Sequence, residues 1–244
     1  MSDLTMFVDY DNVQPSHTRA GPVSLARMLV ALVPTEVLAR YKTVTVRLYG
    51  GWRSKANLTR LAQRLIPQIR AGSPGVVTTQ HAGCTLNLRL MVELADKPIG
   101  ASLPLEGTLV EDRGLRKFSA RSLPWSECAN VGRCGFSDYS YLTHSSACEE
   151  SGCSMKLGDL LVRNEQKMVD TLIVADIAQH VHVAKASDLI VVSSDTDMWP
   201  GVLLALRAGC AVIHIHTMHG WRTQGHLLKT IANQLDRIYK QISV

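Results

Sequence analysis

The chain has 244 residues and a formal net charge of +5, and 46% of its residues are hydrophobic. No apolar run approaches the length that spans a bilayer, and the start MSDLTMFVDYDN lacks the basic and apolar stretches of a secretory signal. We therefore expect a cytoplasmic protein with no membrane partner. Its modest positive charge permits nucleic-acid binding without demonstrating it.

Strands and helices alternate in the first third of the chain. Short apolar runs predict strands over residues 5–12, 43–52 and 75–83. Apolar residues spaced by three and four predict helices over 22–41 and 55–72. This alternation predicts an α/β fold, with a central, mostly parallel sheet flanked by helices.

The alternation stops from about residue 82 to about residue 160. A connection of this length needs structure of its own. Two segments within it, 86–97 and 107–123, have strand character and predict a hairpin or an extended arm. We therefore expect one domain over 1–244 with a β-rich insertion at 82–160. The insertion is also the expected docking surface if the chain binds a partner protein or a second copy of itself.

Four cysteines lie close together within this insertion: Cys128, Cys134, Cys148 and Cys153. In a short, polar stretch they favour a structural zinc site over residues 124–155, because metal binding would supply order that so little apolar content cannot. Their spacing is wider than the usual two-residue knuckle, and His144 is a possible substitute ligand. The alternative is four reduced thiols on a loop. Cys210 lies in an apolar run and is expected in the core.

The α/β pattern then resumes. A helix is expected over 164–181, with Asp170 near its start, where the helix dipole favours a carboxylate. An apolar strand follows over 188–192, and the segments 200–209 and 211–216 have the character of a helix and a strand. His214 and His216 alternate along that last strand and do not by themselves indicate a metal site.

Two apolar strands end abruptly in carboxylates. Asp9, Asp11 and Asn12 follow the first, and Asp195 and Asp197 follow the later one. Ligands of open α/β sheets bind beyond the carboxyl ends of the strands, so these side chains are expected to face one crevice.

Clustered carboxylates repel one another unless a cation neutralises them, and hard oxygen ligands suit Mg²⁺ or Mn²⁺. We expect four carboxylates to hold one or two such ions: Asp9, Asp170, Asp195 and Asp197. Asp176 lies six residues after Asp170, off its helical face, and ranks below them. Helix capping is the alternative for each segment taken alone, and Pro200 suits a first helical turn after Asp197.

The motifs resemble those of the NYN family of PIN-like nucleases, close to its LabA-like branch. The matches to the family's Asp-x-Asp-Asn strand end are Asp9, Asp11 and Asn12. The matches to the family's later helix start are Glu165, Lys167, Val169 and Asp170, with Gln166 inserted between the first two. Those to its Ser-Gly-Asp-x-Asp-Phe strand end are Ser193, Asp195 and Asp197. Ser194 stands where the family usually has Gly. Met198 stands where the family usually has Phe, and it should still fill an apolar gap.

The resemblance covers roughly the first 80 and the last 85 residues, and 227–242 is similar to the family's closing helix. It implies a three-layer PIN-like fold and a Mg²⁺- or Mn²⁺-dependent endonuclease that cleaves RNA by preference and DNA as a possibility. Asn12 would then hold a water molecule at the ion or orient Asp9. Two other functions stay open: a nucleic-acid-binding or scaffold module with little activity, and a metal-dependent phosphatase.

Basic residues offer contacts for a polyanionic substrate, with ordinary solvated charge as the alternative. Lys167 either contacts the scissile phosphate or is solvated. Arg60 and Arg64 lie four apart on one predicted helix face and are expected to contact substrate phosphates. Arg53 and Lys55 precede them, and the insertion holds a second basic group: Arg113, Arg116, Lys117 and Arg121. Trp52, Trp125 and Trp221 are open to base stacking or to packing.

Overall fold

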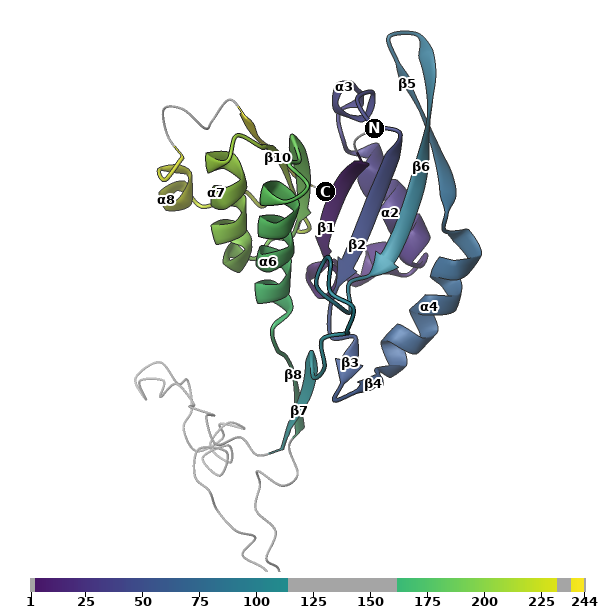
Figure 1. Cartoon of the computed structure of the whole chain (residues 1–244), viewed down its shortest axis with the longest axis vertical. Coiled ribbons are helices and arrows are strands. Elements are labelled where there is room, and N and C mark those ends of the chain that lie inside the picture. Colours follow the sequence, from purple (N-terminus) through teal and green to yellow (C-terminus); the bar gives the residue numbers. More distant parts are fainter. Residues whose placement is uncertain (1–2, 114–161, 232–237, 244) are drawn as a thin grey trace, which may run out of the picture. The chain divides into compact units, whose positions relative to one another are not determined.

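The computed structural model describes residues 3–113, 162–231 and 238–243 (Figure 1). The chain forms two compact units, one of Met1–Leu109 with Gln166–Val244 and one of Val110–Glu165. Apart from Leu109 and Gln166, the two-stranded sheet of β7 (Leu109–Arg113) and β8 (Val162–Gln166) belongs to the second unit. The candidate site belongs to the first unit.

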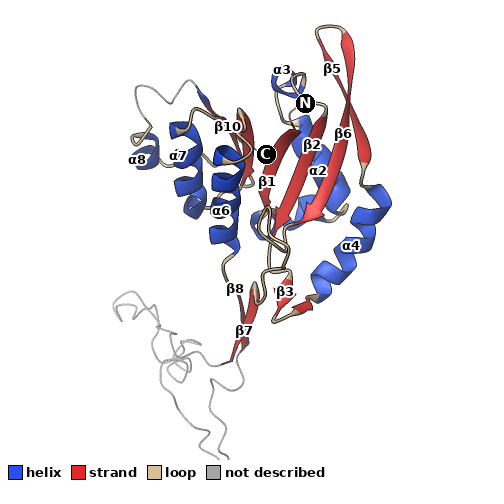
Figure 2. Ribbon diagram, in the orientation of Figure 1, coloured by secondary structure: helices blue, strands red, loops and turns tan. Residues whose placement is uncertain are grey.

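A seven-stranded sheet forms the centre of the first unit, in the order β11-β10-β9-β1-β2-β6-β5 (Figure 2). Its neighbouring strands are parallel except for the antiparallel pair β5–β6. The strands are β1 (Asp3–Asp9), β2 (Thr43–Tyr49), β5 (Gly75–His81), β6 (Cys84–Leu94), β9 (Asp188–Val192), β10 (Ala211–His216) and β11 (Tyr239–Ser243). The predicted α/β class and mostly parallel sheet are confirmed.

Side chains that alternate along the strands divide the core into one cluster on each face of the sheet. Met6 and Val8 of β1 belong to the cluster that includes α2 (Pro22–Ala31) and α4 (Arg60–Gly72). Phe7 belongs to the cluster that includes α6 (Val169–His182) and α7 (Trp199–Arg207). Burying each large apolar side chain contributes roughly 1.5–3 kcal/mol. The helices therefore cover both faces and leave the carboxyl ends of the strands at one edge.

Short elements complete the unit: η1 (Tyr10–Asn12), α1 (Pro15–Thr18), α3 (Thr35–Leu38), β3 (Arg53–Ser54), β4 (Asn57–Leu58), η5 (Thr196–Met198) and α8 (Gly225–Leu228). The helix predicted over 22–41 is divided, because Pro34 interrupts it between α2 and α3. None of the helices in the described ranges combines the length and apolar character needed to cross a bilayer.

The insertion starts later than the sequence predicted. The sequence pattern predicts a beginning near residue 82, yet β6 lies in the central sheet between β2 and β5. Ala82 and Gly83, with φ of 50° and 77°, turn β5 directly back into β6. A tight hairpin needs no helix between its strands, which is why the alternation of strand and helix stops while the sheet continues.

Three predicted helix boundaries also differ. The helix expected from residue 55 begins at Arg60, after the β3–β4 hairpin, and the Thr59 hydroxyl caps it by accepting from Ala62 N–H. The helix expected from 164 begins at Val169, because 162–166 pairs as β8. Of the closing helix expected over 227–242, the described residues show α8 at its start, and 239–243 forms β11 on the edge of the sheet beside β10.

Candidate active site

The site begins where β1 and β9 end side by side. Val8 pairs with Val192, so Asp9 and Ser193 are the next residues of two neighbouring parallel strands. Asp9 is 5% exposed, and its Oδ2 accepts a hydrogen bond from the Ser193 hydroxyl at 2.9 Å. The main-chain N–H of Asn12 also donates to this carboxylate. Two donors therefore fix Asp9 at the carboxyl edge of the sheet.

The pKa of Asp9 is raised to about 7. Burial is the largest cause, and the negative charges of Asp170 and Asp11 add to it. The hydrogen bonds from Ser193 and Asn12 lower the pKa but do not offset the burial. The charged form of Asp9 therefore lacks a neutralising partner among the protein groups around it.

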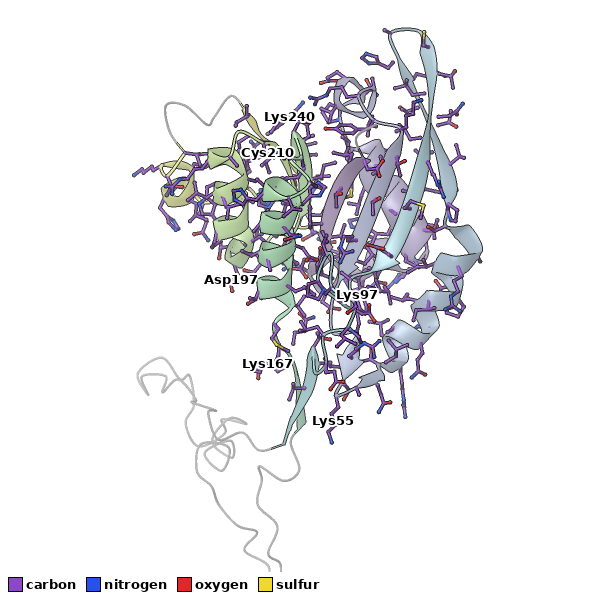
Figure 3. The ribbon with its side chains drawn as sticks, viewed as in Figure 1. Lys55, Lys97, Lys167, Asp197, Cys210 and Lys240 are labelled. Carbon is purple, nitrogen blue, oxygen red and sulfur yellow. The ribbon has the colours of Figure 1, made fainter. Side chains whose placement is uncertain are left out.

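Asp170, Asp195 and Asp197 form the second part of the site. Asp170 lies in the first turn of α6, and its pKa is raised by burial and by the charges of Asp195 and Asp197. Asp195 caps η5, with Oδ1 accepting from Asp197 N–H at 3.0 Å. Figure 3 shows Asp197 and Lys167 near the start of α6. The carboxylates of all three segments are thus within electrostatic range, since Asp9 and Asp170 also interact.

Ser193 connects the two parts of the site. Its Oγ donates to Asp9 and accepts the main-chain N–H of Asp195 at 3.0 Å. Behind it, Nε2 of His214 lies 3.0 Å from the Ser193 carbonyl, and Nδ1 lies 2.8 Å from the Tyr239 hydroxyl. Burial lowers the pKa of His214 to about 3, so the ring is neutral and Nε2–H donates to the carbonyl. The sequence motif contained Ser193 and gave no indication of this bridging role.

Asn12 braces the loops around the site by its side chain. Its Oδ1 accepts from Ser194 N–H at 3.0 Å and from the Thr217 hydroxyl at 2.7 Å. Asn12 contacts Asp9, as expected, but through its main-chain N–H and not through its side chain. Ser194 is not among the described non-glycine residues with positive φ, so the turn does not require glycine there. Met198 is fully buried and fills the apolar gap as expected.

Asp11 points toward the loop after β2. Its Oδ2 accepts from Gly51 N–H at 3.0 Å and from the side-chain amide of Gln166. A Cβ on Gly50 would lie 2.7 Å from the same oxygen, so glycine allows this close approach. Burial raises the pKa of Asp11, and the two donors oppose that rise.

Asp176 is buried and hydrogen-bonded within the protein. It is 1% exposed, and its carboxylate accepts from the Tyr49 hydroxyl at 2.8 Å, from Ile99 N–H at 2.7 Å and from Arg47 at 3.1 Å. It is not among the charges that raise the pKa of Asp9 or Asp170. The structure therefore places it apart from the other four aspartates, within the packing of α6 on the sheet.

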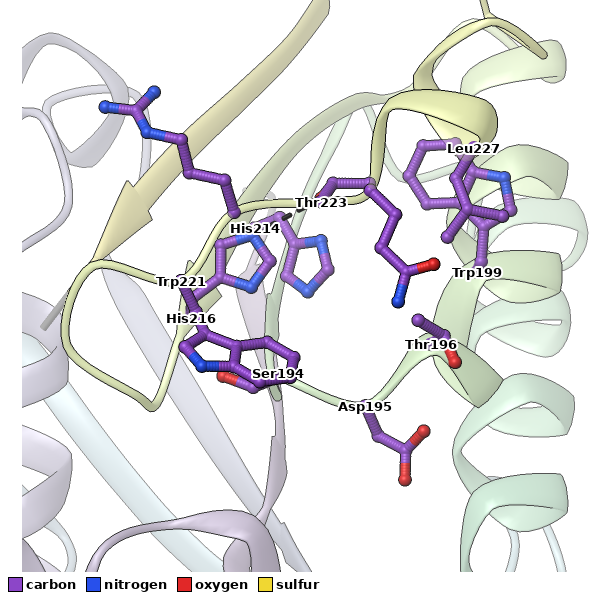
Figure 4. A pocket seen from close by; sticks show the side chains of 11 residues that line it. Ser194, Asp195, Thr196, Trp199, His214, His216, Trp221, Thr223 and Leu227 are labelled. Atoms are coloured by element: carbon purple, nitrogen blue, oxygen red, sulfur yellow. Dashed lines mark hydrogen bonds between the residues drawn. The ribbon is translucent and has the colours of Figure 1, made fainter.

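A hollow lies beside Asp195, between η5 and the loop after β10. Figure 4 shows the indole of Trp221 and the rings of His214 and His216 around it, with Asp195 at its edge. Trp221 is 45% exposed, whereas Trp52 is fully buried and packs in the core. The hollow accommodates little more than water-sized molecules.

The expected basic contacts have different environments. Arg64 lines a pocket with Tyr10 and Asp11, whereas Arg60 is exposed at the start of α4 and does not line it. The guanidinium of Arg53 is bound to Asp96 at 2.8 Å and is not available as a free contact. Lys167 is exposed between β8 and α6, and its main-chain N–H donates to the Thr108 carbonyl.

The expected zinc ligands and most of the second basic group lie outside the described residues. This applies to the whole region 124–155 and to Trp125, Arg116, Lys117 and Arg121; of Arg113, only the backbone is described. Cys210 is buried in the core, as predicted.

The candidate ligands have the right chemistry for a hard divalent cation, although their side chains are not grouped around a common point. Over the ranges that the structure covers, no three His, Cys, Asp or Glu side chains are grouped as ligands of one ion. The carboxylates are nevertheless all-oxygen donors of the kind that Mg²⁺ and Mn²⁺ select. Burial raises the pKa values of Asp9 and Asp170, and neighbouring carboxylates raise them further. A cation would offset both effects.

Comparisons of the chain with protein-family models, with curated proteins and with solved structures found no match.

Proposed function

We propose that this protein is a metal-dependent nuclease that hydrolyses phosphodiester bonds within a nucleic-acid chain, with RNA as the preferred substrate. The observation that supports it best is the electrostatic coupling of carboxylates from three separate segments at the carboxyl edge of a parallel sheet. Helix capping accounts for Asp195 alone. It does not account for the buried, poorly compensated charge of Asp9. The motif resemblance to the NYN family of PIN-like nucleases supports the same proposal.

Asp9, Asp170, Asp195 and Asp197 would hold the cation. A bound Mg²⁺ or Mn²⁺ ion would supply Lewis acidity at the phosphate and a lowered pKa for water. The four side chains come from β1, the first turn of α6 and the loop after β9. The burial of Asp9 makes its ionisation, near neutral pH, sensitive to whether a cation is present.

The remaining residues position these carboxylates. Ser193 fixes the orientation of Asp9 and the main chain of Asp195 together. Asn12 and Thr217 hold the loop at Ser194, so that the ends of β1, β9 and β10 stay in register. Such preorganisation lowers the cost of reorganising the site during reaction. Arg64 and Lys167 are the proposed positioning contacts for substrate phosphates.

The test is cleavage of an internally labelled single-stranded RNA with Mn²⁺, run beside the same reaction containing excess chelator. We expect internal fragments that appear only without chelator, and slower cleavage of single-stranded DNA. A protein that binds the RNA and never cuts it would instead be a binding module. Hydrolysis confined to mononucleotide phosphate esters would identify a phosphatase.

A further inference from the structure

A second feature of the first unit adjoins the carboxylates. A pocket of about 460 Å³ lies between the segment that follows β1 and the helix α4. This volume is typical of sites for small organic ligands. Its lining includes Tyr10, Val13, Arg19, Leu61, Arg64 and Gln68. The pocket begins next to the site, because Tyr10 directly follows Asp9.

Two arginines bring positive charge to the pocket. Arg19 comes from the C-terminal end of α1 and Arg64 from the second turn of α4. Within the part of the chain that the structure describes, neither guanidinium has a hydrogen-bond or salt-bridge partner, in contrast to Arg40, Arg47 and Arg53. Arg64 lies close enough to Tyr10 to act against the rise in its pKa. Two unpartnered guanidinium groups at one pocket suit a phosphate.

The remaining lining suits a flat, partly apolar group. Leu61 supplies aliphatic surface, and Val13 and Tyr10, each 7% exposed, contribute their small exposed parts to an apolar floor. The Gln68 side chain reaches across toward Gly21, where a Cβ would lie 2.8 Å from its Oε1. Gly21 has φ of 90°, so this approach depends on glycine in two ways. Gln68 therefore brings an amide group, which can donate and accept hydrogen bonds, to the edge of the pocket.

Asp11 is the one carboxylate in the lining, and its charge opposes a phosphate. Its Oδ2 already accepts hydrogen bonds from Gly51 and Gln166, which direct it toward the loop after β2. This arrangement favours a ligand whose phosphate lies at Arg19 and Arg64, away from Asp11.

We infer that this pocket holds one unpaired nucleotide of the substrate, next to the phosphodiester that is cut. Its phosphate is bound by Arg19 and Arg64, and its base packs against Tyr10, Val13 and Leu61. This inference rests on the proposed nuclease function and deepens it, because a base can enter the pocket only when it is not stacked and paired in a duplex. The substrate class is therefore single-stranded nucleic acid.

The test measures binding of a labelled single-stranded oligonucleotide at several salt concentrations, with Mn²⁺ present and in an Asp195→Asn background so that the strand stays intact. The double change Arg19→Ala and Arg64→Ala should weaken binding about tenfold or more at low salt and flatten the logarithmic salt dependence by roughly one to two. Arg70→Ala is the matched control. Arg70 is in the same helix but six residues from Arg64, on another face, and its removal should change affinity less than twofold.

A second arm tests the base. An oligonucleotide with one abasic position next to the cleavage point should bind roughly tenfold more weakly to the protein with both arginines. A duplex of the same sequence should bind more weakly than the single strand. Equal affinity for duplex and single strand, or a double variant that behaves like Arg70→Ala, would overturn the inference even if the protein cleaves RNA. Conversely, arginine-dependent binding of the single strand by a protein that never cuts it would support the pocket and refute the nuclease.

Discussion

The hydroxyl of Ser193 donates a hydrogen bond of 2.9 Å to the carboxylate of Asp9, a residue 184 positions away in the sequence. The same oxygen accepts the main-chain N–H of Asp195. One buried hydroxyl group thereby fixes two proposed metal ligands that come from different strands. Several consequences of this arrangement can be measured.

Replacing Ser193 by Ala should disturb the acid–base behaviour of the site more than its fold. The hydroxyl lowers the pKa of Asp9, so its loss should raise that pKa further above about 7. Unfolding free energy should fall by about 1–2 kcal/mol, because the Asp195 N–H loses its acceptor. The acidic limb of the pH–rate profile should move to higher pH. Ser194→Ala is the control, since that hydroxyl contacts the loop at Thr217 and Met218. An unmoved limb in Ser193→Ala would refute the bridging role.

The buried charge of Asp9 should make stability depend on pH. Its pKa rises from 3.8 to about 7 on folding, so the folded protein binds this proton more tightly than the unfolded chain. The stabilisation is complete below about pH 4 and is lost as pH rises toward 7, by at most roughly 4 kcal/mol. Asp9→Asn lacks this titration.

The difference in unfolding free energy between Asp9→Asn and the unaltered protein should therefore favour the variant more at pH 8 than at pH 4.5. Urea unfolding in the presence of chelator measures it. Comparing the two proteins at each pH cancels the opposite contribution of His214, whose lowered pKa costs stability in acid. An equal difference at both pH values would show that Asp9 is not a poorly compensated buried carboxylate.

Asp176 should behave as a structural carboxylate. Asp176→Asn weakens contacts with Tyr49 and Ile99 and leaves the partly buried Arg47 without one of its two acidic partners. We expect a loss of about 3 kcal/mol in unfolding free energy. Cleavage rates measured well below the melting temperature should stay within about threefold. A loss of cleavage as large as that from changing Asp195, in a protein that is still folded, would instead assign Asp176 to the site.

The four cysteines of region 124–155 are predicted to bind one structural zinc ion. Elemental analysis of the purified protein should give about one zinc per chain. Changing Cys148 and Cys153 to Ser should remove the metal and make this region sensitive to protease, while residues of the central sheet stay protected. If the protein contains no zinc and all four thiols react freely in the native state, the site does not exist.

Local patterns in the sequence predicted the strands and helices that surround the site. The apolar runs before Asp9 and Asp195 gave β1 and β9, and the rule about strand ends placed both carboxylates at one edge. What the sequence could not supply were contacts between distant segments. Which strands lie side by side decides three such contacts. They are the hydrogen bond from Ser193 to Asp9, the hydrogen bond from Ser194 to Asn12, and the burial of Asp176 away from the other carboxylates.

The errors had the same origin. Residues 84–94 alternate like any strand, and only pairing with β2 and β5 makes them part of the central sheet. The segment 239–242 has helical spacing within a longer pattern, yet Tyr239 and Ile242 pair with the open edge of β10. Tertiary pairing thus overrode a local helical preference at 239–242, whereas at 84–94 it decided which sheet a correctly expected strand joins.

The proposed function requires that the clustered carboxylates hold a divalent cation used to cut nucleic acid. The most direct test compares Asp195→Asn with the unaltered protein in Mn²⁺-dependent cleavage of single-stranded RNA, at a fixed, limiting metal concentration. Asparagine keeps an oxygen that can cap η5, so the metal-free variant should melt no lower than the unaltered protein. Cleavage should fall at least a hundredfold, because a charged ligand is lost. Full activity of Asp195→Asn under limiting metal would contradict the account.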